Sequence, residues 1–260
     1  MDFTGQTAFI TGGGGRIGRV VGRRFAEAGA RVGLFDLDGA RVREAAEAIP
    51  GGRAAAFAGD VSQAADVDAA VAGCERALGP VDVLVNAAGI FPNTPLLEMD
   101  PGEWDRVFAV NTRGMMLCCK AVASRLVARG APGAIVNFSS GAGTSARAGA
   151  AHYCGSKAAV NMLTHVLAIE LGPHGIRVNA VAPGLVTDEP LRAGTSGVHP
   201  YIGMMIEATP MRRTGIAEDI AGAVLFLASA ESPWTTGAIL EVSGGSHCGR
   251  PHVPLSRDLR

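Results

Sequence analysis

Two residue types that are rare in this chain stand four positions apart. The 260-residue sequence has two tyrosines and two lysines, and Tyr153 and Lys157 are one of each. On a helix, residues four apart share a face, so the Lys157 ammonium would lie beside the Tyr153 phenol. A nearby positive charge favours the phenolate and lowers the pKa of a phenol from about 10 toward the range of a proton-transfer catalyst. The pair is therefore a candidate general acid/base, although an exposed helical pair, or a core tyrosine with a lysine reaching past it, fits the spacing equally well.

The overall composition narrows the class of protein. Hydrophobic residues make up 48% of the chain and glycine occurs 36 times, which is typical of a well-buried α/β protein. The net charge of -1 provides no basic surface for nucleic acid or for a membrane. No apolar stretch is long enough to span a bilayer, and residues 1–5 are expected to begin a strand and not a signal sequence. We expect a soluble, cytoplasmic protein.

The cysteines and histidines give no metal or disulfide signature. The five cysteines are odd in number and include no CxxC, which favours buried free thiols in a reducing compartment. The six histidines form neither HxxxH nor HExxH, so we predict no metal site.

Apolar runs bounded by glycine or proline alternate with helical patterns, which predicts a doubly wound parallel sheet with helices on both faces. The expected strands are 7–10, 31–35, 54–57, 81–85, 134–138, 177–181 and 238–242. The expected helices include 17–28, about 101–129 with a break near Asn111, 153–172 and 217–228. Asp100, Pro101 and Glu103 form an N-terminal helix signal in which Glu103 can return the capping bond.

The domain organisation is predicted to be simple. No internal repeat, charged block or linker divides the sequence, so residues 1–260 are expected to form one domain. The segment 187–210 is predicted to be irregular because it is rich in Gly, Pro, Thr and Met. Long insertions in compact α/β domains are often functional, so this segment is a candidate substrate lid.

A glycine-rich segment, residues 11–18 (TGGGGRIG), joins the first predicted strand to the first predicted helix. Glycines there let the backbone approach a pyrophosphate, whose charge is met by amides at the helix N-terminus. About twenty residues on, Asp36 ends the second strand, where a carboxylate would bind the adenosine 2'-hydroxyl and repel a 2'-phosphate. Asp38 could serve the same purpose or could simply cap the next helix.

Two further segments follow predicted strands at the edge where open α/β sheets bind ligands. They are Asp60-Val61 and Asn86-Ala87-Ala88-Gly89. Helix capping by Asp60 and an ordinary turn at 86–89 would explain them equally well.

Taken together, these motifs resemble the short-chain dehydrogenase/reductase family from about Thr7 to Gly245. The glycine-rich segment approximates the family's TGxxxGxG, residues 86–89 match its Asn-Ala-Ala-Gly, and Pro183-Gly184 resembles its turn after the sixth strand. The resemblance implies a catalytic tetrad of Asn111, Ser140, Tyr153 and Lys157. It also implies that NAD contacts Gly12, Gly14, Gly15, Arg16, Ile17, Gly18, Asp36, Leu37, Asp60, Val61, Asn86, Ala87, Ala88, Gly89, Tyr153, Lys157, Pro183, Gly184, Val186 and Thr187.

The sequence departs from the family pattern at three places. Arg16 replaces the second motif glycine, and its charge blurs the preference for NAD that Asp36 indicates. Asp188 stands where the family often has a threonine, so Thr187 is assigned the carboxamide contact in its place. Ser139 and Ser140 are adjacent, and the thirteen-residue spacing to Tyr153 selects Ser140.

The implied reaction is hydride transfer between NAD(H) and a secondary alcohol or ketone. Tyr153 would exchange the proton, Ser140 would hold the substrate oxygen, Lys157 would bind the nicotinamide ribose and lower the Tyr153 pKa, and Asn111 would free a carbonyl to bind a water on a proton path. An NADPH-dependent 3-oxoacyl-thioester reductase is the alternative within the family, and a non-enzymatic nucleotide-binding protein is a further one.

Residues near these positions indicate a fairly apolar substrate. The candidate pocket residues are Phe91, Gly141–Thr144, Arg147, His152, Leu185, Val186, Tyr201, Ile202, Met204, Met205 and Ile206. Packing of the lid against the domain or a second subunit would account for its methionines equally well, and His152 would more often face elsewhere. Surplus apolar residues on the helices about 104–129 and 153–172 predict a homotetramer, or at least a dimer, as the resemblance also implies.

Overall fold

A seven-stranded parallel sheet organises residues 1–249, the part of the chain that the computed structural model describes. The predicted one-domain range of 1–260 therefore extends into residues that lie outside the described part. The strands are β1 (Thr7–Thr11), β2 (Arg31–Asp36), β3 (Ala54–Ala58), β4 (Val83–Asn86), β5 (Gly133–Phe138), β6 (Ile176–Pro183) and β7 (Ile239–Val242). Their order across the sheet is β3-β2-β1-β4-β5-β6-β7, which confirms the predicted doubly wound fold.

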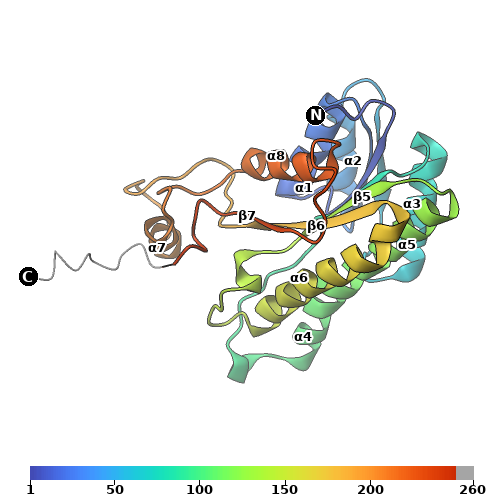
Figure 1. Ribbon diagram of the computed structural model, residues 1–260. Helices are drawn as coiled ribbons and strands as arrows, with labels where there is room; N and C mark the ends of the chain where they lie inside the picture. The colour runs from blue at the N-terminus through green and yellow to red at the C-terminus, as the bar shows by residue number, and fades with distance from the viewer. Residues whose placement is uncertain (250–260) are drawn as a thin grey trace, which may run out of the picture.

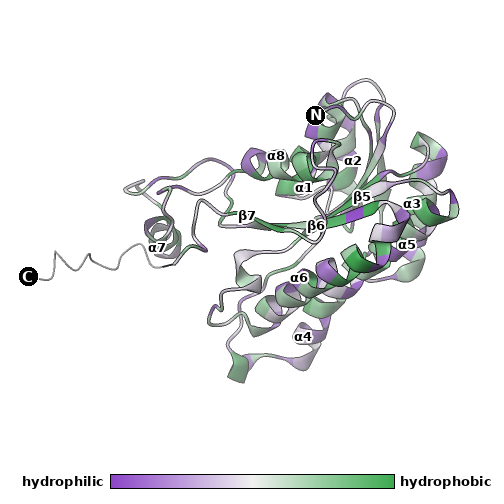
Figure 2. Ribbon diagram, viewed as in Figure 1, coloured by the Kyte–Doolittle hydropathy of each residue, from purple (hydrophilic) through white to green (hydrophobic). Residues whose placement is uncertain are grey.

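Helices cover both faces of this sheet (Figure 1). They are α1 (Arg16–Glu27), α2 (Gly39–Glu47), α3 (Ala64–Leu78), α4 (Pro101–Phe108), α5 (Met115–Ala128), α6 (Ala151–Leu171), α7 (Pro200–Ala208) and α8 (Ala217–Ala228). One core cluster joins the sheet to α1, α2 and α8, and the other joins it to α3, α5 and α6. Figure 2 shows the apolar strands lying between these two helical layers.

The order of the strands changes direction between β1 and β4. From β1 the chain moves outward through β2 and β3, and it then returns to β4 on the other side of β1. Thr11 pairs with Asn86, so the carboxyl ends of β1 and β4 lie side by side. Open α/β sheets bind ligands in the crevice at such a switch point.

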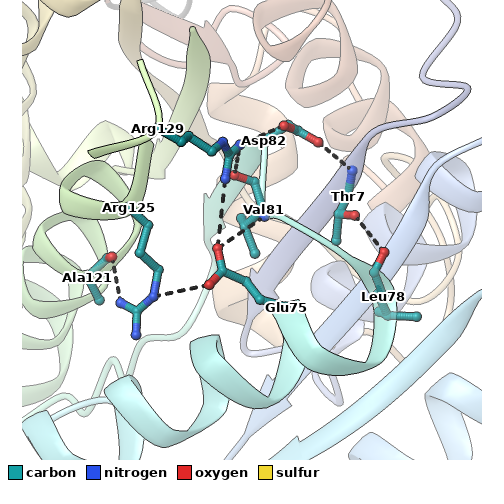
Figure 3. A network of polar contacts seen from close by, with 8 residues as sticks. All are labelled: Thr7, Glu75, Leu78, Val81, Asp82, Ala121, Arg125 and Arg129. Carbon is teal, nitrogen blue, oxygen red and sulfur yellow. Dashed lines mark hydrogen bonds and ion pairs between the residues drawn. The ribbon is translucent and has the colours of Figure 1, made fainter. Parts of the chain in front are cut away.

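A polar network connects the elements at the amino-terminal ends of β1 and β4, opposite the carboxyl ends (Figure 3). Asp82 accepts a hydrogen bond from the Thr7 amide (2.9 Å) and one from Arg129 (2.7 Å). Arg129 and Arg125 also approach Glu75 of α3. This network ties α3 and α5 to β1 and β4 without involving the carboxyl edge.

Four local expectations need correction. Residues 1–5 do not begin a strand, because Phe3 packs edge-on against Phe25 of α1 and the strand starts only at Thr7. Strand β4 begins at Val83 and not at residue 81, since the preceding Asp82 belongs to the polar network.

The lid segment is not irregular throughout, because α7 occupies 200–208. His199 accepts a bond from the Tyr201 amide (3.2 Å) and Pro200 takes the first helical position, which together start this helix. Glu103 does not return a capping bond to Asp100, because its carboxylate contacts His152 of α6 instead.

Candidate active site

Helix α6 brings Tyr153 and Lys157 to the carboxyl end of β5. The Lys157 Nζ donates a hydrogen bond to the Phe138 carbonyl oxygen (2.7 Å), and it lies 5.8 Å from the centre of the Tyr153 ring. The Lys157 side chain is almost completely buried. The four-residue spacing therefore places the ammonium beside the phenol ring, as helical geometry requires.

Burial dominates the protonation of both groups. It raises the pKa of the Tyr153 phenol, and a hydrogen bond with the Ser140 side chain and the charge of Arg147 act in the opposite direction. Burial also lowers the pKa of Lys157 to about 8. Burial is thus the largest influence on the Tyr153 pKa. That Lys157, together with a bound nicotinamide, lowers this pKa stays a prediction.

The two adjacent serines face different partners. Ser139 is buried and its hydroxyl donates to the Asn161 side chain on α6. Ser140 interacts with the Tyr153 phenol, and its Oγ also accepts from the Ala142 amide (3.2 Å). The structure thus brings Ser140, and not Ser139, to the candidate acid/base.

Asn111 lies in a π-helical turn, Ala109–Gly114, that separates α4 from α5. Its side chain accepts from the Ile90 amide (2.8 Å) and donates to the Ile90 carbonyl (2.9 Å) and to Ser156 (3.1 Å). The break expected near this residue is therefore present as a widened turn, and π-turns often occur at functional sites. The side chain itself fastens the loop after β4 to α6.

The glycine-rich turn after β1 has no room for side chains at its key positions. Gly12 has a φ of 67°, and a Cβ there would lie 2.8 Å from the Ala88 amide nitrogen. A Cβ on Gly18 would collide with the Gly12 carbonyl oxygen. The turn is thus packed directly against residues 87–88. Gly14 and Gly15 precede α1, with Gly15 at its N-cap, and Ile17 lies in its first turn. Such a turn provides amides and a helix N-terminus for a pyrophosphate.

Asp36 lies beside this turn. Its carboxylate accepts hydrogen bonds from the Gly14 amide (2.9 Å) and the Asp38 amide (3.0 Å). Leu37 next to it is 75% exposed, which leaves an apolar surface near the carboxylate. Asp38 accepts from the Ala40 and Arg41 amides, so it caps α2, and the capping alternative holds for Asp38.

Arg16 joins the glycine-rich turn to the start of the lid. Its Nε lies 2.7 Å from one carboxylate oxygen of Asp188, and its Nη2 lies 3.2 Å from the other. Nη1 also donates to the Val186 carbonyl (2.9 Å). The Thr187 hydroxyl is within 2.6 Å of the Thr214 hydroxyl and of the Glu189 carbonyl. The two departures from the family pattern, Arg16 and Asp188, thus bind each other.

The remaining predicted cofactor residues line the same edge. Pro183 ends β6, and a Cβ on Gly184 would lie 2.9 Å from the Ser243 Cα. A Cβ on Gly89 would lie 3.7 Å from the Lys157 Nζ. Asp60 does not cap α3, because Gln63 takes that position and Asp60 accepts from the Ser62 amide (2.8 Å) within its own turn.

A small cavity of about 10 Å³ lies between the glycine-rich turn and the π-turn. Its lining includes Thr11, Val61, Asn86, Asn111 and Phe138. The Asn86 Nδ2 donates to Asn137 (2.9 Å), while its buried Oδ1 has no partner among the described residues. A cavity of this size with an unpaired buried oxygen suits a single water molecule.

Sequence reasoning missed two arrangements around Tyr153. His152 is fully buried, its Nδ1 accepts from the Tyr153 amide (2.8 Å), and its Nε2 lies 2.9 Å from Glu103 of α4. It therefore faces away from the substrate side, and the Nδ1 acceptor role assigns its proton to Nε2. Glu103, three positions after the Asp100 cap, fits both a capping bond and this contact with His152, and spacing alone does not distinguish them.

The second arrangement joins Arg147 and helix α7. The Arg147 guanidinium lies 5.9 Å from the centre of the Tyr153 ring and donates to the Tyr201 hydroxyl of α7 (3.1 Å). Phe91 stands edge-on to the same ring at 6.3 Å. These contacts join segments far apart in the chain, and no local pattern could have indicated them.

The fold and the glycine-rich turn at its switch point define a dinucleotide-binding α/β protein. A family profile described as "Enoyl-(Acyl carrier protein) reductase" matches residues 15–247. The chain is 41% identical to (3R)-3-hydroxyacyl-CoA dehydrogenase of Canis lupus familiaris, over 92% of this chain and 95% of that protein. It is 42% identical to galactitol 2-dehydrogenase (L-tagatose-forming) of Cereibacter sphaeroides, over 93% and 94%.

A solved structure gives the same result. The crystal structure of a short-chain type dehydrogenase/reductase from Mycobacterium marinum superimposes with a TM-score of 0.87 at 34% identity, over 95% of this chain and 97% of that one. The chain belongs to the short-chain dehydrogenase/reductase family. It is an oxidoreductase that acts on CH–OH groups and their ketones with a nicotinamide cofactor. Among the described helices, none combines the length and apolarity that crossing a membrane requires.

Proposed function

We propose that this protein is an NAD-dependent dehydrogenase or ketone reductase in which Tyr153 is the general acid/base. The observation that carries the proposal is the convergence of Ser140, Tyr153 and Lys157 at the carboxyl end of β5. A nucleotide-binding protein without activity has no use for a buried ammonium beside a phenol. This site therefore favours an enzyme over the binding-only alternative.

The residues divide the work as follows. The nicotinamide cofactor, when bound, supplies or accepts the hydride. Ser140 holds the substrate oxygen, and Tyr153 gives that oxygen a proton during reduction or removes one during oxidation. Lys157 holds the nicotinamide ribose, and Asn111 with the adjacent cavity provides a place for water on the proton path.

The preference for NAD rests on Asp36 and on what holds Arg16. A carboxylate at the end of β2 suits a ribose 2'-hydroxyl and repels a 2'-phosphate. Arg16 was the residue that could offset this repulsion, but Asp188 already binds its guanidinium. The same carboxylate at Asp36 disfavours an NADPH-dependent 3-oxoacyl-thioester reductase.

The acid/base role is tested with Tyr153→Phe, which keeps the ring and removes the hydroxyl. We expect turnover to fall by about 1,000-fold while NADH binding, followed by fluorescence, stays within about twofold. Lys157→Ala is expected to weaken both. Substantial turnover by Tyr153→Phe at its pH optimum would overturn the assignment.

The cofactor preference is tested by comparing kcat/KM for NAD and NADP. Wild type is expected to prefer NAD, and Asp36→Ala to narrow the difference by about tenfold or more. Asp188→Asn removes the counter-charge of Arg16, so it should also improve the use of NADP. A wild-type preference for NADP would refute this part of the proposal.

The lid, the assembly and the compartment belong to the same proposal. Residues 187–210, with α7 at their centre, are proposed to close over a fairly apolar substrate.

Exposed apolar residues on α5 and α6 support a homotetramer, or at least a dimer. The free thiols, three of them buried, support a cytoplasmic location, since reducing compartments keep cysteines unpaired.

A further inference from the structure

Arg147 places a positive charge near the Tyr153 ring. It belongs to the loop between β5 and α6, and its guanidinium lies 5.9 Å from the centre of the Tyr153 ring. One of its nitrogens donates to the Tyr201 hydroxyl of α7 (3.1 Å). The cation thus lies where the loop, the catalytic helix and the lid helix meet.

No carboxylate among residues 1–249 pairs with this charge. Within that range, the one side-chain hydrogen bond of Arg147 goes to a neutral hydroxyl. Two nearby carboxylates are engaged elsewhere, since Glu103 binds His152 (2.9 Å) and Asp188 binds Arg16 (2.7 Å), and Glu207 of α7 forms no ion pair with Arg147. A guanidinium has five N–H donors, so most of the hydrogen-bonding capacity of Arg147 remains for a ligand.

The shape of the group indicates what kind of anion fits it. A planar guanidinium binds a carboxylate through two parallel hydrogen bonds, whereas phosphate sites commonly combine several donors or cations. Side chains near the Tyr153 ring or the guanidinium include the aromatic rings of Phe91 and Tyr201. Lys157, a second cation beside the phenol ring, is buried and donates to the Phe138 carbonyl, so Arg147 is the exposed cation at this place.

We propose that Arg147 binds a carboxylate of the substrate, so that the natural substrate is a hydroxy acid, or the corresponding oxo acid, with an apolar chain. The proposal rests on the proposed function, because it concerns the same site. Arg147 acts here as a residue that determines substrate specificity, and Tyr201 orients its guanidinium from the lid. The substrate hydroxyl exchanges its proton with Tyr153 while Arg147 holds the carboxylate.

The test compares substrates that differ only in their charge. Wild type, Arg147→Gln and Arg147→Lys are assayed with NAD on 2-, 3- and 4-hydroxy acids of four to eight carbons and on the methyl ester of each. We expect wild type to prefer at least one acid over its ester by about tenfold or more in kcat/KM. Arg147→Gln should lose about 10- to 100-fold on that acid, mainly through KM, and should change little on the ester. Arg147→Lys should recover part of the loss, because lysine keeps the positive charge but cannot form the two parallel hydrogen bonds of a guanidinium.

A control and a binding measurement separate the possible failures. Arg76→Gln removes a positive charge from an exposed position on α3 and should leave the acid preference unchanged. Calorimetric titration of the enzyme–NAD complex with unreactive saturated carboxylic acids should show binding that Arg147→Gln loses. This readout does not depend on turnover.

The outcomes decide between the two proposals. Oxidation of esters and acids at equal rates, or an equal loss on both with Arg147→Gln, would overturn the carboxylate site and leave the dehydrogenase proposal standing. A preference for phosphate esters of hydroxy compounds over the carboxylic acids would also overturn it. Absence of turnover with every substrate would count against the proposed function, while the calorimetric titration would still decide whether Arg147 binds carboxylates.

Discussion

Lys157 is a lysine that folding removes almost completely from water, with a single carbonyl partner at Phe138. Burial favours its neutral form, so its pKa falls from an ordinary 10.5 to about 8. Between these two values the unfolded chain binds more protons at this residue than the folded protein does. Stability therefore rises with pH across that window, and the full penalty of the buried charge applies below about pH 8.

This sign gives a measurable prediction for the cofactor-free protein. The free energy of unfolding is compared for wild type and Lys157→Met by urea denaturation at a fixed protein concentration. From pH 7 to pH 10.5 the difference should move in favour of wild type by about 3 kcal/mol, because methionine has no proton to lose. Parallel pH profiles for the two proteins would contradict the burial of a charged lysine.

His152 fixes the backbone at the start of the catalytic helix. Its Nδ1 accepts from the Tyr153 amide and its Nε2 proton goes to Glu103, so both ring nitrogens are used. Neither bond reaches the Tyr153 hydroxyl. We therefore expect His152 to position Tyr153 without contacting the reacting atoms.

Replacing His152 by leucine should affect stability and turnover together. The substitution leaves the Tyr153 amide without its acceptor, which should cost about 1–3 kcal/mol of unfolding free energy. We expect kcat to fall while KM for NAD changes little, as measured by steady-state kinetics. His152→Asn supplies an oxygen acceptor and should recover part of the loss, and equal damage by both variants would contradict the hydrogen-bonding role.

At the scale of elements, a polar network lies near the amino ends of the strands, whereas the candidate site lies at their carboxyl ends. The network in Figure 3 connects α3, α5, β1 and β4 near the amino ends of the strands. The glycine-rich turn, Asp36 and the four residues predicted to form the catalytic tetrad all lie at or near the carboxyl ends. This separation allows the two edges to be perturbed independently.

Arg129→Met is predicted to lower stability without changing the site. Arg129 donates to the Val81 carbonyl (2.7 Å) and to Asp82 (2.7 Å), and its removal leaves both acceptors without this partner. We expect a loss of about 1.5–3 kcal/mol in unfolding free energy, with kcat within about twofold of wild type. Arg53→Met, at an exposed position, is the matched control and should be nearly neutral. A large fall in kcat with unchanged stability would contradict this division.

At the scale of the whole molecule, α5 and α6 carry more apolar surface than the sheet covers. Met115, Cys118 and Val122 of α5 are buried, whereas Met116 on the same helix is 38% exposed. On α6, Met162 is 62% exposed and Ile169 is 76% exposed. Exposed large apolar side chains on two helices are consistent with a surface that a partner covers.

We expect this surface to be covered by further copies of the chain. Light scattering at micromolar concentration should give a homotetramer, or at least a dimer, because two-fold contacts would bury the same helices on every subunit. Met162→Lys should shift the population toward smaller species, since it places a charge in the predicted contact. Arg43→Glu on α2 is the control, and a stable, active wild-type monomer would contradict the prediction.

The order of strands and helices was predictable because periodicity and turn residues are local. The break near Asn111 was predictable as well, although its π-helical form was not. Errors arose where a distant contact determined the outcome. Strand β4 begins at Val83, after Asp82, whose side chain binds the Thr7 amide. Glu103 contacts His152 and does not make the predicted capping bond, because α6 lies next to α4 in the folded chain.

The sequence by itself determined the fold, the class of cofactor and the pairing of Tyr153 with Lys157, because each depends on residue type and short-range spacing. The tertiary structure decided which serine faces Tyr153, that Asp188 binds Arg16, and that Arg147 stands over the phenol ring. It also decided that burial is the largest influence on the Tyr153 pKa. These outcomes depend on desolvation and on contacts between residues far apart in the chain, and both arise only when the chain is packed.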